Sequence, residues 1–129
     1  MNEIAIFKQV AARWLNQQAK DLLGDGFAGK LLRPILAEAI DKYSADPAVD
    51  MFLNIFVKDG KFNIDTLLDK YIDLFTKDGG IQFKWADIAP MGSMLDKMNG
   101  NRTNVITAAD IKGLKDNFLA EVKKQNVQP

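Results

Sequence analysis

The chain of 129 residues contains no histidine and no cysteine. Histidine is the commonest general base and metal ligand, and cysteine supplies thiolate nucleophiles, disulfides and thiolate metal sites. Ser44 and Ser93 therefore have no imidazole to activate them. We expect a protein that is not an enzyme, with no catalytic residues, no cofactor and no metal ion. The catalytic alternative left open is histidine-independent chemistry by carboxylates.

An excess of positive charge and a long apolar run are also missing. Lys and Arg number 17, as do Asp and Glu, so the formal net charge is zero. Nucleic-acid binding usually requires a basic surface because phosphate contacts dominate the affinity. No stretch approaches the roughly 18 apolar residues of a membrane span, and the N-terminus lacks the features of a secretory signal. We expect a cytoplasmic protein without membrane contact, and nucleic acid is disfavoured as a partner.

What the sequence does contain is apolar residues at helical spacing. In residues 3–23, Ile4, Phe7, Ala11 and Trp14 recur at three- and four-residue intervals, which predicts an amphipathic helix. A second stripe begins at Leu32 and continues to Tyr43, and we expect Pro34 in the first turn of that helix. Asp46 followed by Pro47 is typical of a helix start, so a third helix is predicted over residues 47–58.

The remaining segments complete the predicted fold. Further helices are expected over residues 64–76 and 90–98, and the capping-box pattern from Thr107 to Asp110 opens a last helix. Residues 81–85 alternate like a strand, but a single strand cannot form a sheet, so we expect a β-bridge or a connector. We predict an all-α fold, a single compact bundle of five or six short helices. It forms one domain over residues 1–125, followed by a frayed tail at 126–129.

The third predicted helix differs from the others because it is apolar on most sides. A helix of this kind is either central in its domain or covered by a partner. We expect this helix to be central, but both explanations remain open for its apolar residues. Those six residues are the candidate interface: Met51, Phe52, Leu53, Ile55, Phe56 and Val57.

The glycine-rich segment 24–30, Gly-Asp-Gly-Phe-Ala-Gly-Lys, matches parts of two phosphate-binding patterns. Both patterns require a β-strand directly before the glycines, and the phosphate loop also requires Ser or Thr where Leu31 stands. The preceding residues are predicted to be helical. We therefore expect an interhelical loop and no nucleotide.

The tripeptide Lys-Asp-Gly occurs twice, at residues 58–60 and 77–79, each time after a predicted helix. Glycine readily takes the left-handed conformation that ends helices, so both copies are predicted to be helix stops. The surroundings faintly match a calcium loop. The positions that should bear its first and last carboxylates hold Ile55, Leu74, Thr66 and Trp85, so no calcium site is expected.

Two side-chain patterns could serve either binding or structure. Asp65, Asp69 and Asp73 follow helical spacing and form an acidic stripe, which is a possible face for a basic partner or an ordinary solvent-exposed face. We favour the solvent-exposed face. The methionines in the segment 90–98, Met91, Met94 and Met98, could form an adaptable binding surface. We expect them to fill the core instead.

A function without catalytic residues is most often binding or scaffolding. The sequence therefore predicts a non-catalytic protein-interaction or structural assembly module with a protein partner or self-association, such as a bacterial or phage accessory protein. A nucleic-acid-associated helical protein is the alternative, and a histidine-independent enzyme is the second alternative. The nucleic-acid alternative would use the lysines of the last helix: Lys112, Lys115, Lys123 and Lys124.

Overall fold

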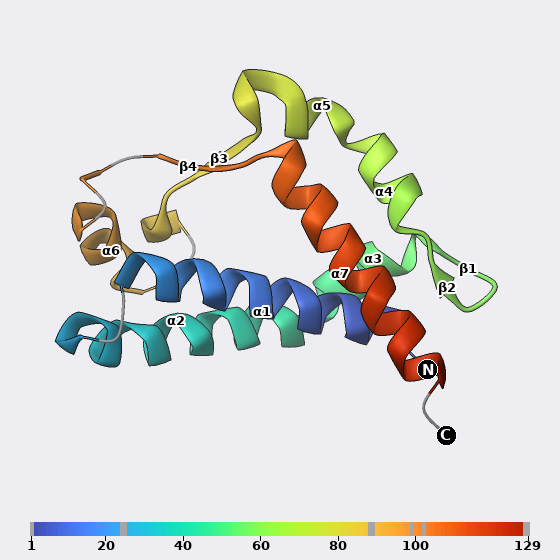
Figure 1. Ribbon diagram of the computed structural model, residues 1–129, viewed down its shortest axis with the longest axis horizontal. Helices are drawn as coiled ribbons and strands as arrows, with labels where there is room; N and C mark the ends of the chain where they lie inside the picture. Colours follow the sequence, from blue (N-terminus) through green and yellow to red (C-terminus); the bar gives the residue numbers. More distant parts are fainter. Residues whose placement is uncertain (1, 24–25, 88–89, 99, 102, 128–129) are drawn as a thin grey trace.

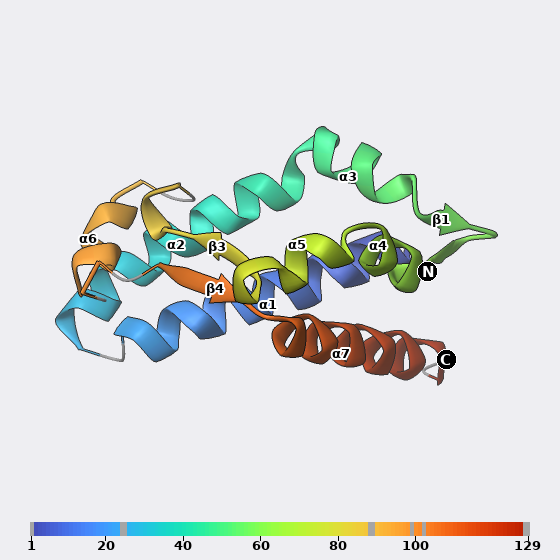
Figure 2. The same cartoon turned by 90° about the horizontal axis from the view of Figure 1, so that it is seen from above.

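The computed structural model describes residues 2–23, 26–87, 90–98, 100–101 and 103–127. Its longest elements are α1 (Glu3–Leu23) and α2 (Phe27–Ala45), which lie side by side and antiparallel (Figure 1). The predicted first helix is confirmed over its full length. It packs against α2 on one side and against the last helix, α7 (Ala108–Val127), on another (Figure 2).

The second helix begins earlier than predicted. Pro34 lies inside α2 and not in its first turn, because the helix already starts at Phe27. A proline within a helix removes one backbone hydrogen bond and crowds the carbonyl group four residues earlier. Pro34 is exposed, and so is Lys30, the residue that carries that carbonyl group. The first turns of α2 were missed because Phe27 and Leu31 lie on its exposed side, outside the apolar stripe.

The third helix, α3 (Pro47–Asn54), starts where the sequence predicted. The Asp46 side chain accepts a hydrogen bond of 2.9 Å from the Ala48 N–H and caps the helix. Its predicted end at Lys58 is wrong, because the helix already ends at Asn54. The residues that follow lead into a hairpin of β1 (Val57–Lys58) and β2 (Lys61–Phe62).

The turn of this hairpin contains the first Lys-Asp-Gly sequence. Asp59 and Gly60 both have positive φ angles, 54° and 76°, as a two-residue hairpin turn requires. The first copy is therefore a hairpin turn and not a helix stop. The second copy forms a 3-10 turn, Lys77–Gly79, directly after a helix, and Asp78 and Gly79 are again left-handed.

The helix predicted over residues 64–76 is divided in two. Asn63 caps α4 (Ile64–Lys70), and α5 (Ile72–Thr76) follows after a break at Tyr71, whose φ and ψ angles are −110° and 19°. After α5 the chain enters a second two-stranded sheet. In that sheet β3 (Ile81–Phe83) pairs antiparallel with β4 (Asn104–Ile106), so the predicted bridge is a short ladder.

Between these strands the chain forms a 3-10 turn, Trp85–Asp87, and α6 (Gly92–Met98). The last helix, α7 (Ala108–Val127), opens with the predicted capping box. The Thr107 N–H donates to Asp110 Oδ2 at 2.9 Å, and the Asp110 N–H donates to Thr107 Oγ1 at 3.2 Å. The helix includes two residues of the tail predicted to fray, and residues 128–129 lie outside the described part.

The described residues thus form seven α-helices and two two-stranded sheets, and the all-α prediction is confirmed. Seven helices replace the predicted five or six because the break at Tyr71 divides one of them.

The buried side chains form two clusters along α1. The first cluster joins the N-terminal half of α1 to α3, the hairpin, α4 and α7, and the second joins its C-terminal half to α2, Trp85 and α6. The prediction of a central third helix is therefore wrong, because α1 is the element that contributes to both clusters. The first cluster contains Ile4, Ile6, Val10, Leu53, Phe56, Phe62, Ile64, Leu67 and Phe118. The second cluster contains Ala19, Leu32, Leu36, Ala39, Ile40, Trp85 and Leu95.

Candidate interaction surface

The six residues of the candidate interface divide between core and surface. Leu53 and Phe56 are each 5% exposed and belong to the first cluster, and Val57 is half-buried in β1. The other three side chains are exposed, and we call them the α3 face: Met51 at 73%, Ile55 at 68% and Phe52 at 41%. Figure 2 shows α3 at the edge of the molecule, on the side opposite α7. Complete enclosure of this helix by its neighbours, one of the two explanations left open, is therefore wrong.

Aromatic contacts support the α3 face from below. The ring of Phe52 lies 5.6 Å from that of Phe56 and 5.9 Å from that of Tyr71, measured between centroids. Because Phe56 is buried and Tyr71 is half-buried, Phe52 stands on a base fixed by the first cluster. Offset and edge-to-face ring pairs of this kind favour a defined side-chain position.

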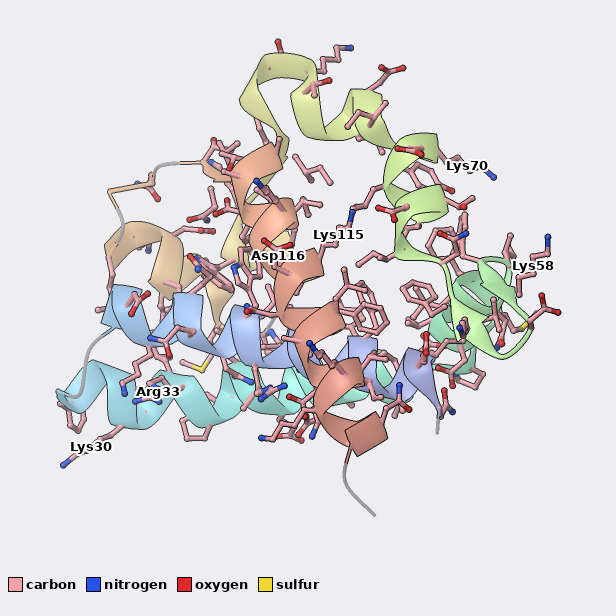
Figure 3. All side chains as sticks on the ribbon, turned by 45° about the vertical axis from the view of Figure 1, so that its right-hand side comes forward. Lys30, Arg33, Lys58, Lys70, Lys115 and Asp116 are labelled. Atoms are coloured by element: carbon pink, nitrogen blue, oxygen red, sulfur yellow. The ribbon has the colours of Figure 1, made fainter. Side chains whose placement is uncertain are left out.

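Positive charge flanks the α3 face. The Lys70 ammonium group lies 5.8 Å from the ring centroids of both Phe56 and Tyr71, within the range of a cation–π contact. Lys58 follows directly after the half-buried Val57. Figure 3 shows both lysines extending outward on the same side of the molecule. An apolar centre with a basic rim is the resulting surface.

An ion pair fixes the direction in which α3 leaves α2. Lys8 on α1 donates to Asp50 Oδ1 at 2.6 Å and to the Ser44 carbonyl oxygen at 2.7 Å. The Lys8 side chain is 19% exposed, so this contact is less screened by water than a surface pair. It joins α1 to the end of α2 and to the first turn of α3, and it holds the opposite side of α3 against the protein.

The acidic stripe does not lie on one continuous helix. The break at Tyr71 separates Asp73 on α5 from Asp65 and Asp69 on α4. Lys115 on α7 forms an ion pair with Asp65, and Figure 3 shows its side chain directed toward α4. The hydrogen bond to Asp65 raises the pKa of Lys115, loss of water contact opposes this shift, and nearby carboxylates, including Asp116, add to it. All three carboxylates are exposed, in agreement with the favoured solvent-exposed face, and a role of the stripe in binding a partner stays a prediction.

The methionines of α6 are exposed, so the expectation that they fill the core is wrong. Met91, Met94 and Met98 are between 42% and 49% exposed. The helix instead turns Gly92, Leu95 and Asp96 inward, at the three- and four-residue spacing of a helical face.

Asp96 is a buried charged residue that sequence reasoning missed. Its carboxylate accepts hydrogen bonds from the N–H groups of Trp85 at 2.9 Å and Ala86 at 3.1 Å. Gly92 approaches the same turn so closely that a Cβ atom there would lie 2.0 Å from the Trp85 carbonyl oxygen. These residues hold α6 against the second cluster. No periodic signal could reveal them, because their partners are backbone atoms of a distant turn.

Three further expectations from the sequence concern the glycine-rich segment 24–30, a metal site and a membrane span. The helix α1 continues to Leu23, so a helix and not a strand leads into the segment 24–30, whose residues 24–25 lie outside the described part. The expected interhelical loop is shorter than that segment, because residues 27–30 already belong to α2. Among the residues that the structure describes, no group of three or more acidic side chains is arranged to hold a metal ion. No helix in that same part of the chain is long and apolar enough to cross a membrane.

Comparison with known proteins gives no relative for this chain: no protein-family model, no curated protein and no solved structure matches it. The surface must therefore be interpreted from its own geometry.

Proposed function

We propose that this protein is a non-catalytic interaction module, of the structural or assembly kind, that binds another protein chain through the α3 face. The observation that carries the proposal is the exposure of Met51 and Phe52 on α3 and of Ile55 directly after it, beside the buried Leu53. Scattered single apolar residues on a surface need no explanation, but contiguous apolar patches mark interaction sites.

The energetics support a role in binding. Burying an exposed Phe, Ile or Met side chain is worth about 1.5–3 kcal/mol. Association costs several kcal/mol in lost freedom, and a micromolar complex requires about 8 kcal/mol of net binding free energy. Three such side chains supply a substantial part of this requirement. The α3 face therefore suits the apolar centre of a larger contact with a polar or charged rim.

The two alternatives are less well supported by the geometry. For nucleic-acid binding, one of the four lysines of α7, Lys115, is engaged with Asp65, while the net charge of the chain is zero. For carboxylate catalysis, the buried Asp96 and the half-buried Asp110 already accept backbone hydrogen bonds. Neither observation favours a reaction or a phosphate contact over protein binding.

Photo-crosslinking in the cells that produce the protein tests the proposal. A photoreactive residue replaces Ile55 in one version, and in a matched control it replaces Leu119, an exposed apolar residue on α7. We expect a discrete protein adduct at position 55, formed with another protein or another copy, and none at position 119. Absence of an adduct at position 55, or the same adducts at both positions, would contradict the proposed function.

A further inference from the structure

The helix α2 carries a second apolar surface, which no part of the described chain covers. A groove with a volume of about 680 Å³ runs along the C-terminal half of α2. Its floor includes Ile35, Tyr43 and Pro90. We call this surface the α2 groove. Tyr43 is 52% exposed, although it belongs to the helical stripe from which the second helix was predicted.

The rim of the α2 groove is acidic on balance. Glu38 and Asp46 carry negative charge and Lys42 carries positive charge, and all three residues line the groove and are exposed. The rim of the α3 face is positive at Lys70, whose ammonium group lies over the Phe56 ring, and Lys58 extends outward on the same side of the molecule (Figure 3). Complementary potentials of this kind orient two surfaces and exclude wrong partners.

We propose that the α2 groove binds the α3 face of a second copy of this chain. The inference rests on the proposed function and names the partner. Met51, Phe52 and Ile55 of one copy would cover the apolar floor of the groove in the other. Lys58 and Lys70 would lie beside Glu38 and Asp46, where opposite charges favour the pairing.

Each copy of the chain carries both surfaces, so a dimer can form the same contact twice, once in each direction. Asp46 lines the end of the α2 groove and also caps α3, so the groove and the α3 face follow each other along the chain. In a two-fold dimer, each residue pair across the interface occurs in both directions. Each copy then supplies one groove and one face. With zero net charge, two copies approach each other without overall electrostatic repulsion.

Two substitutions test the two halves of the contact separately. Ile55→Asp places a negative charge on the α3 face, where it would meet the acidic rim, and Tyr43→Lys places a positive charge in the groove, where it would meet the basic rim. Both residues are exposed, so both variants should remain folded. By analytical ultracentrifugation we expect a wild-type dimer and a dissociation constant raised at least about tenfold in each variant. Leu119→Asp is the matched control and should dimerise like the wild type.

Mixing the two variants gives the decisive result. A mixed dimer contains one intact contact, formed by the α3 face of the Tyr43→Lys copy and the groove of the Ile55→Asp copy. In the other contact the introduced carboxylate meets the introduced ammonium group. We therefore expect the mixture to dimerise more tightly than either variant alone. Should circular dichroism show that one variant is unfolded, Met51→Asp replaces the first and Glu38→Lys the second.

Three outcomes would overturn the inference. They are a wild type that stays monomeric up to about 1 mM, a Tyr43→Lys variant that dimerises like the wild type, and a mixture no tighter than its components. A monomeric wild type that still forms an adduct with a different protein at position 55 would leave the proposed function intact. Loss of that adduct as well would remove both.

Discussion

The two clusters along α1 are stabilised in different ways. The first cluster joins aliphatic side chains to phenylalanine rings from elements far apart in the sequence, whereas the second includes two alanines and a turn held by backbone contacts. A cluster of side chains tolerates changes in its backbone better than losses of volume. A cluster in which backbones approach closely tolerates a loss of side-chain volume better than a change in its backbone. The two halves of the molecule should therefore respond to different substitutions.

Three phenylalanines from three elements form the centre of the first cluster. The ring of Phe7 on α1 lies 4.9 Å from that of Phe62 on β2 and 5.8 Å from that of Phe118 on α7, between centroids. Phe62 and Phe118 are 5.6 Å apart and nearly perpendicular. Glu3 also accepts a hydrogen bond of 2.8 Å from the Phe62 N–H, which ties the hairpin to α1.

The second cluster brings backbones close together. Ala19 on α1 is 2% exposed and packs in the cluster with Leu36 on α2, where a small residue permits close helix approach. On the other side, Gly92 lies against the carbonyl group of Trp85, and Asp96 accepts the two N–H groups described above. This region depends on a glycine and a carboxylate, in addition to the edge-to-face contact of Phe83 with Trp85, whose ring centroids lie 5.3 Å apart.

The largest expected effect is the loss of a ring from the first cluster. Phe118 is 1% exposed, and its replacement by alanine leaves a cavity among the rings, so Phe118→Ala should lower the free energy of unfolding by about 3–5 kcal/mol. Leu119→Ala, which changes the exposed neighbour, should cost less than about 1 kcal/mol. Urea denaturation measures both values. Similar losses in the two variants would contradict the packing described here.

The next effect distinguishes the second cluster. Gly92→Ala would place a methyl group against a backbone oxygen, so it should cost about 1–3 kcal/mol and speed hydrogen exchange in α6 and around Trp85. Gly113 on α7 is the matched control, because a Cβ atom there meets nothing within 4 Å. Gly113→Ala should stabilise the protein by about 0.5–1 kcal/mol through its greater helix propensity. Equal effects of the two substitutions would remove the distinction between the clusters.

The smallest effect concerns the ion pair between Lys115 and Asp65. The pKa of Lys115 is raised above its ordinary value of 10.5 in the folded state. The stabilisation is therefore fully present below pH 10.5 and is lost as the pH rises through the raised pKa. Comparison of the wild type with Lys115→Met by urea denaturation should give a small difference at pH 8 that disappears in more alkaline solution. A difference that grows with pH would contradict this pairing.

Local signals allowed prediction of the helix starts that a side chain caps, such as those of α3 and α7, but not of the start of α2, where Gly26 provides no side-chain cap. The caps at Asp46 and at Thr107–Asp110 involve residues two or three positions apart, so the sequence itself contains both partners. The end of α3 could not be predicted in this way, because it depends on pairing between Val57 and Phe62. The Asp59–Gly60 dipeptide was an available hairpin signal that we interpreted as a helix stop.

The candidate surface was only partly predictable for the same reason. The run from Met51 to Val57 showed that α3 is apolar on most sides, but periodicity cannot indicate which sides neighbouring elements cover. Leu53 and Phe56 share the first cluster with residues of α1 and α7, which are remote in sequence, and of the nearer α4. The α2 groove was not predicted because Tyr43 has the spacing of a core residue.

The contrast between Leu53 and Ile55 tests the central claim most directly. Leu53 on α3 is 5% exposed and Ile55, directly after the end of that helix, is 68% exposed, so aspartate should act differently at the two positions. Circular dichroism and sedimentation velocity are measured for Leu53→Asp and Ile55→Asp in parallel. We predict that Leu53→Asp loses its helical signal, because a buried unpaired charge is very costly, and that Ile55→Asp keeps its helical signal but fails to associate. Unfolding of both variants, or unchanged association of a folded Ile55→Asp variant, would contradict an interface on the α3 face.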